Sequence, residues 1–126
     1  MSDITPENVQ EKLNAFQHMQ QQVQTLSQQT SQMDMSIRET ERTLEEIKDS
    51  GKNTVLYRAI GSVMKKVEDI GQLKKDLLEE KESMEIRNKS LKNQLDKINE
   101  ELVKIQKKLA PVLKKVQKTS GPNASE

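Results

Sequence analysis

Two heptad-patterned runs separated by a short β-favouring segment constrain this chain more than any other feature of its sequence. Apolar residues step three and four positions apart from Val9 to Ile47, and the stepping returns from Ile70 to Val116. Sustained spacing of this kind keeps one side of a helix against a partner helix, as in a coiled coil. The sequence therefore predicts a mainly α-helical fold in which two long antiparallel helices are joined by the segment between them.

That segment, residues 54–67, predicts a β-hairpin. Val55 to Ile60 is rich in β-favouring residues, Gly61 and Ser62 supply a two-residue turn, and the chain returns from Val63 to Val67. Glycine at the first central position suits a type II′ turn, whose twist matches the flanking strands. One more helical turn linking the two coils is the alternative, and Gly61 and the β-branched residues argue against it.

Both faces of the first strand carry apolar side chains, so we expect both faces to be buried against other parts of the assembly. An isolated two-stranded ribbon is marginal in water, and strands from other subunits are therefore expected to complete the sheet. The residues predicted to form this assembly hairpin are Val55, Leu56, Tyr57, Ile60, Gly61, Val63, Met64 and Val67.

Capping residues predict where the helices begin and end. Thr5 suits the N-cap of a first helix over residues 6–48, and Asp69 suits the cap of a second helix over residues 69–117. Gly51 is expected to end the first helix in the left-handed conformation. Residues 119–126 are rich in Ser, Gly, Pro and Asn, which is typical of a disordered C-terminal tail.

The seam of the second helix is interpreted as shifting by one residue near Arg87 and Asn88. Such a shift is a stutter, which changes the winding of the coil locally. Thr30, Thr40 and Asn88 are polar seam positions, so we expect loose packing in the middle of both helices.

Composition excludes several classes of function. The 126 residues are 33% charged, 32% hydrophobic and 2% aromatic, which suits two striped helices better than a broad core that could shelter a catalytic site. No cysteine is present, the net charge is +1, and residues 1–20 lack the apolar core of a signal peptide. We expect a cytoplasmic protein that is not an enzyme, needs no metal or other cofactor, and binds neither membrane nor nucleic acid.

The segment Leu56-Tyr57-Arg58-Ala59-Ile60-Gly61-Ser62-Val63, together with Leu44-Glu45-Glu46-Ile47 before it and Met84-Glu85-Ile86-Arg87 after it, resembles the β-class of the prefoldin family. The resemblance covers residues 1–118. The second strand, with Met64, Lys65 and Lys66, is less apolar than is usual in that family.

The resemblance implies a heterohexamer of two α-class and four β-class subunits whose hairpins join into β-barrels. It also implies an ATP-independent molecular chaperone, a holdase that binds unfolded proteins at its coiled-coil tips and passes them to a group II chaperonin. The partners would then be an α-class subunit, further copies of this chain, unfolded clients and the chaperonin. A structural or tethering coiled coil without affinity for unfolded protein is the alternative, and a nucleic-acid-binding coiled coil is a third class.

The tip of the coil is where we look for client contact. Folding the chain back near residue 58 places Ile47 opposite about Ile70 and Val9 opposite about Lys108, to within about one helical turn. Residues 112–118 would then project without a partner seam. Exposed apolar side chains on a mobile tip would suit unfolded chains, although the same residues could simply finish the coil. The candidate client-binding residues are Val9, Leu13, Phe16, Leu109, Val112, Leu113 and Val116.

Overall fold

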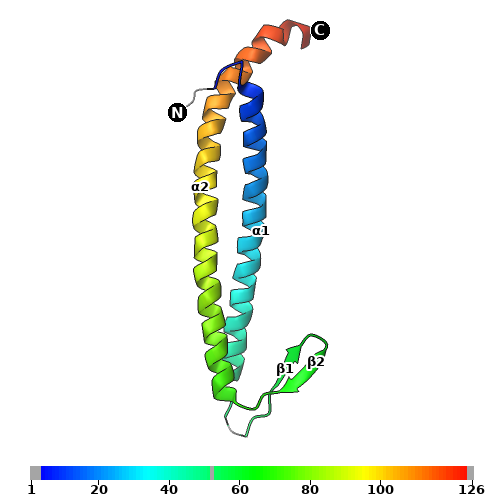
Figure 1. Ribbon diagram of the computed structural model, residues 1–126, viewed down its shortest axis with the longest axis vertical. Coiled ribbons are helices and arrows are strands. Elements are labelled where there is room, and N and C mark those ends of the chain that lie inside the picture. Colours follow the sequence, from blue (N-terminus) through cyan, green and yellow to red (C-terminus); the bar gives the residue numbers. More distant parts are fainter. Residues whose placement is uncertain (1–3, 52, 125–126) are drawn as a thin grey trace. The chain divides into compact units, whose positions relative to one another are not determined.

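The computed structural model describes residues 4–51 and 53–124, with side chains described as far as Lys115. Its elements in chain order are α1 (Val9–Ile47), β1 (Tyr57–Ile60), β2 (Val63–Lys66) and α2 (Ile70–Ala124). The chain divides into two compact units: unit 1 is Met1–Gln29 with Leu91–Glu126, and unit 2 is Thr30–Ser90. Within each unit two antiparallel helical segments lie side by side, and unit 2 also carries the hairpin (Figure 1). The mainly helical architecture predicted from the sequence is confirmed.

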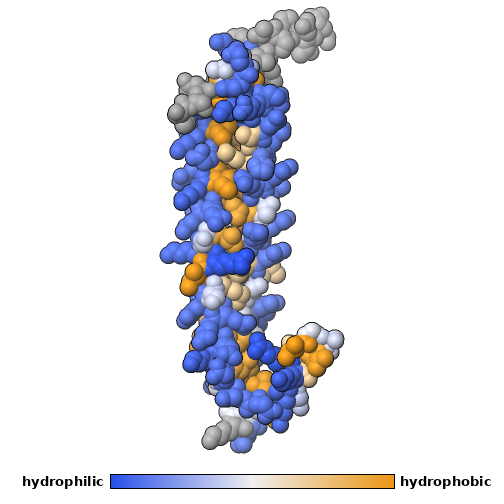
Figure 2. Space-filling view, viewed as in Figure 1, coloured by the Kyte–Doolittle hydropathy of each residue, from blue (hydrophilic) through white to orange (hydrophobic). Residues whose placement is uncertain are grey.

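The seam of α1 follows the predicted heptad positions. Each of these residues is buried or half-buried, and Figure 2 shows apolar side chains gathered where the helical segments of each unit meet. Outward positions carry mostly polar side chains, which is why the helices pair along one stripe only. The seam residues are Val9, Lys12, Phe16, Met19, Val23, Leu26, Thr30, Met33, Ile37, Thr40, Leu44 and Ile47.

The seam of α2 runs without interruption, so the predicted stutter is wrong. Met84 and Leu91 are seven residues apart and both are half-buried, as one heptad position requires. Lys81 is also half-buried, and Asn88 is only 5% exposed. These two polar residues occupy true seam positions, and their polarity hid the regular repeat in the sequence.

Local hydrogen bonds fix both helix starts. The Thr5 N–H donates to Asn8 Oδ1 at 2.8 Å, and the Asn8 N–H donates to Thr5 Oγ1 at 3.4 Å, which is a reciprocal cap. Residues 6–8 form a turn, so the helix proper begins at Val9 and not at residue 6. At the second start the Gln72 N–H donates to Asp69 Oδ1 at 3.0 Å, as predicted.

The end of α1 differs from the expectation for Gly51. Among the described residues only Gly61 has a positive φ, so Gly51 does not adopt the left-handed conformation. Lys74 of α2 takes over the capping role, because its Nζ donates to the carbonyls of Lys48 and Ser50, both at 3.0 Å. The Lys74 side chain thus supplies hydrogen bonds to these carbonyls that backbone N–H groups would supply in a glycine cap.

The α2 helix continues to Ala124, past the predicted end at residue 117. It therefore includes residues 119–124, where the sequence predicts a disordered tail, while residues 125–126 lie outside the described residues.

Candidate functional site

The hairpin of unit 2 presents apolar side chains on both of its faces. Tyr57 pairs with Lys66, Arg58 with Lys65, Ala59 with Met64 and Ile60 with Val63, and all eight residues are exposed. Alternation along a strand places Tyr57, Ala59 and Met64 on one face and Ile60 and Val63 on the other. Met64 is 65% exposed and Tyr57 59% exposed, so this apolar surface is open in the single chain (Figure 2).

The turn of the hairpin has the predicted conformation. Gly61 has a φ of 60°, and no described residue other than glycine has a positive φ. A type I′ turn needs positive φ at both central residues, so Ser62 excludes it and the pair fits type II′.

Two of the predicted assembly residues anchor the base of the hairpin. Leu56 and Val67 are half-buried, and the Val67 N–H donates to the Leu56 carbonyl at 2.9 Å. They are therefore less accessible to another subunit than Val55, which is 58% exposed beside them. The structure brings all eight predicted residues into one hairpin and divides them into exposed faces, a turn and a base.

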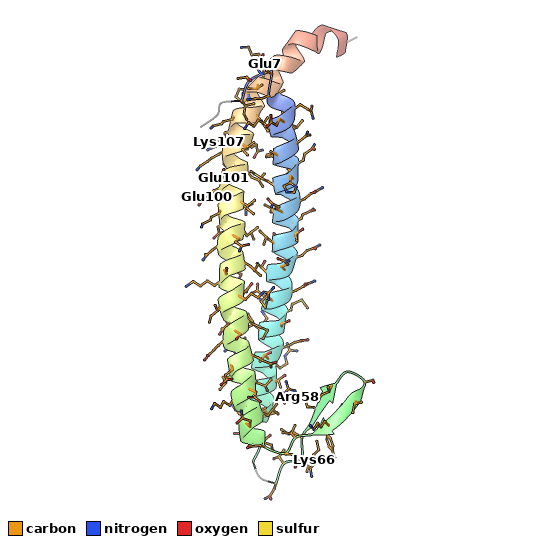
Figure 3. The ribbon with its side chains drawn as sticks, in the orientation of Figure 1. Glu7, Arg58, Lys66, Glu100, Glu101 and Lys107 are labelled. Carbon is orange, nitrogen blue, oxygen red and sulfur yellow. The ribbon has the colours of Figure 1, made fainter. Side chains whose placement is uncertain are left out.

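Arg58 joins the hairpin to α2, which the sequence analysis missed. Its guanidinium reaches toward the helix and lies 3.9 Å from Glu80 Oε1 (Figure 3). The groove around it is also lined by Glu39, Asp76 and Glu79, and Arg58 is the one cation among the described residues that line this groove. No spacing rule in the sequence brings residue 58 to residue 80, because the loop before α2 sets that approach.

The helices of unit 2 pair in a different register from the predicted one. Asn88 Nδ2 donates to Asp34 Oδ1 at 2.7 Å, whereas the predicted alignment places Asp34 opposite residue 83. Lys81 Nζ lies 3.3 Å from Glu41 Oε2, which gives the same displacement of five residues. The sequence analysis assumed that the chain folds back near residue 58. The midpoint in sequence of both observed pairs is instead Gly61, in the hairpin turn.

Unit 1 shows a similar displacement through its own contacts. Leu102 of α2 lines a shallow groove with Gln20, Gln21 and Val23 of α1, whereas the predicted alignment places Leu102 opposite Ala15. Residues 109–113 of α2 therefore face the first turns of α1.

The six candidate tip residues whose side chains the structure describes are buried or half-buried. Leu109 is 3% exposed, the most buried apolar side chain among the described residues, and Val112 and Leu113 are half-buried. Val9, Leu13 and Phe16 of α1 are half-buried as well. The expectation that Val112 and Leu113 lack a partner seam is wrong, because the five-residue displacement closes the coil over them. The side chain of Val116 lies outside the described residues.

The described part of the chain contains no group of three or more His, Cys, Asp or Glu side chains arranged to hold a metal ion. Within that same part, no helix is long and apolar enough to cross a membrane.

The geometry defines a coiled-coil subunit built around one exposed hairpin. The family model described as prefoldin subunit matches residues 10–116. The prefoldin subunit beta of Archaeoglobus fulgidus is 36% identical over 100 residues, which cover 78% of this chain and 83% of that protein. The prefoldin subunit beta of Thermoplasma acidophilum is 33% identical over 86 residues, which cover 68% of this chain and 69% of that protein. The crystal structure of the prefoldin beta subunit from Thermococcus strain KS-1 matches with a TM-score of 0.73 and 28% identity, covering 90% of this chain and 97% of that one.

This chain belongs to the prefoldin family. It is a prefoldin-type chaperone subunit.

Proposed function

We propose that the chain is a β-class subunit of a cytoplasmic heterohexamer with two α-class and four β-class subunits. The observation that carries this proposal is the exposed hairpin, because four large apolar side chains on its two strands lie open in the single chain. Strands of neighbouring subunits would bury these side chains and satisfy the free strand edges, forming intersubunit β-barrels.

The assembled protein is proposed to act as an ATP-independent holdase. It would capture unfolded proteins with the ends of its coiled coils and pass them to a group II chaperonin. The tip residues Val9, Leu13, Phe16, Leu109, Val112, Leu113 and Val116 remain the proposed client contacts. Because Leu109 is buried in the structure, client binding there would require the last turns of the coil to separate.

A structural or tethering coiled coil is the second candidate. The burial of Leu109 and the partial burial of Val112 and Leu113 favour it, because a well-paired tip offers little surface to a client. The two candidates agree on assembly through the hairpin and differ on affinity for unfolded protein.

Assembly is tested by Ile60→Asp in the complex formed with the α-class partner. A carboxylate inside an intersubunit sheet costs several kcal/mol per site, so native mass measurement should show smaller species while the helical signal persists. Ile86→Asp is the matched control, because Ile86 is 72% exposed on α2 outside the hairpin. An unchanged hexamer mass for Ile60→Asp would refute assembly through the hairpin.

Client capture is tested by dilution of a chemically denatured enzyme into buffer that contains the assembled protein. The holdase proposal expects suppressed aggregation, and the tethering alternative expects none. The double variant Val112→Ser with Leu113→Ser should reduce suppression severalfold, while Val103→Ser, at an outward position that is 48% exposed, should not. Equal suppression by both variants would place the client contact elsewhere.

A further inference from the structure

A long stretch of α1 carries no formal charge. Residues 13–33 contain no Asp, Glu, Lys or Arg, in a chain that is 33% charged, and eight of these 21 residues are glutamines. The α2 segment in the same unit is very different: ten of the 25 residues from 91 to 115 are charged, among them Glu100, Glu101 and Lys107 (Figure 3). An outer helix face needs only to be polar for solubility, so the glutamines can keep this stretch of α1 soluble without adding charge.

In unit 1 four of these glutamines form one side of a shallow groove. The four residues are Gln17, Gln20, Gln21 and Gln24. The last three lie three, four and seven positions after the first, so all four follow one flank of α1. The half-buried side chains of Val23 and Leu102 supply the apolar part of the lining. We call these six residues the amide groove.

The amides of this groove are free to bind. Within the described part of the chain, the side chains of the four glutamines make no hydrogen bond to another protein group. Two glutamines outside the groove are engaged, since Gln10 Nε2 donates to Asn14 Oδ1 at 3.1 Å and Gln72 Nε2 donates to Asp76 Oδ1 at 2.8 Å. Each free amide offers two N–H donors and a carbonyl acceptor without any charge.

We propose that the amide groove binds the main chain of unfolded polypeptide in extended form. A main chain presents one donor and one acceptor per residue, which is the same chemistry that a row of glutamine amides offers. The apolar lining would take up small apolar side chains of the client. Because the groove is uncharged, acidic and basic clients would bind equally well, and contact with the main chain would not depend on client sequence.

This inference rests on the proposed holdase function and adds to it a contact surface distinct from the apolar tip. The groove is open in the folded coil, whereas Leu109 at the tip is buried. A client could therefore bind the groove first, without separation of the helices.

The test uses the complete complex and a fluorescent, reduced and carboxamidomethylated α-lactalbumin, which cannot refold. Dissociation constants are measured by anisotropy. Gln17→Glu with Gln24→Glu places two charges in the groove, and Gln22→Glu with Gln29→Glu places two charges at the same spacing on α1 outside it. The corresponding lysine pairs repeat the comparison with opposite sign.

Both groove pairs should weaken binding about tenfold, because charged side chains lose the amide pairing and must be desolvated beside an uncharged main chain. Both control pairs should leave binding within about twofold. Wild-type affinity should change little between about 0.05 and about 0.5 M salt, since no ion pair is involved.

Two results would overturn the inference. Equal effects of groove and control pairs would show that the groove is not a contact, and opposite effects of Glu and Lys would show that charge, not main-chain pairing, governs binding. A complex that fails to bind the unfolded probe at all would instead refute the holdase function on which the inference rests. Helix content and hexamer mass are measured for every variant, so that misfolding is recognised.

Discussion

Replacing Asn88 by leucine should stabilise the coil of unit 2, although it removes a hydrogen bond. Asn88 lies at a seam position and is 5% exposed. Its Nδ2 donates to Asp34 Oδ1 at 2.7 Å, but its own Oδ1 is buried without a hydrogen-bond partner. The native seam therefore contains one good polar contact and one unsatisfied acceptor in the same side chain.

The magnitudes favour the apolar replacement. The bond to the Asp34 carboxylate contributes about 1.5–3 kcal/mol, but Asp34 is only half-buried and recovers much of this from water. Removing the buried, unsatisfied acceptor regains about 1–3 kcal/mol, and burying leucine adds about 1.5–3 kcal/mol. We expect Asn88→Leu to raise the free energy of unfolding by about 2 kcal/mol.

The assay is thermal and urea unfolding of the complex at one fixed concentration, followed by circular dichroism, because association also contributes to apparent stability. A gain of about 2 kcal/mol should raise Tm by several degrees. Asn88→Ala is the control: it removes the same polar atoms but leaves a cavity, so it should be less stable than Asn88→Leu by about 2 kcal/mol or more. A loss of stability in Asn88→Leu would refute the reasoning and show that the Asp34 bond outweighs the unsatisfied acceptor.

Three further substitutions test other parts of the structure. Leu109→Ala should cost about 3 kcal/mol in chemical denaturation because Leu109 is 3% exposed, while Val103→Ala, at a 48% exposed position, should cost less than about 1 kcal/mol. Gly61→Ala should destabilise the hairpin by about 1 kcal/mol, because φ is 60° there, and should weaken assembly in native mass measurement. Lys74→Met should accelerate amide hydrogen exchange at the end of α1 severalfold, since the carbonyls of Lys48 and Ser50 lose their donor; unchanged exchange would show that water replaces it.

Three features that are set by a few neighbouring residues could be predicted from the sequence. The cap at Thr5, the cap at Asp69 and the turn at Gly61 each depend on contacts within about four residues, and the structure contains all three. The heptad seam of α1 was also predictable, because one period decides which side of a helix is covered.

Features that depend on the joining of the two helices could not be predicted. The register differs by five residues because it depends on how the loop turns, as the Asp34–Asn88 pair shows. A seam that contains Lys81 and Asn88 looks broken when apolar residues alone are counted. The Arg58–Glu80 contact and the capping by Lys74 likewise join residues far apart in the sequence.

The displaced register changes where an unfolded chain can first make contact. Contact at Leu109 requires local opening, so the apparent affinity of the tip equals its intrinsic affinity reduced by the small fraction of open molecules. Contact at the amide groove carries no such penalty, because Gln17 and Gln24 are exposed in the closed coil. Any substitution that tightens the last turns of unit 1 should therefore weaken capture through the tip and leave capture through the groove unchanged. The dependence of client affinity on the stability of unit 1 thus distinguishes the two contacts even where both contribute to holding one chain.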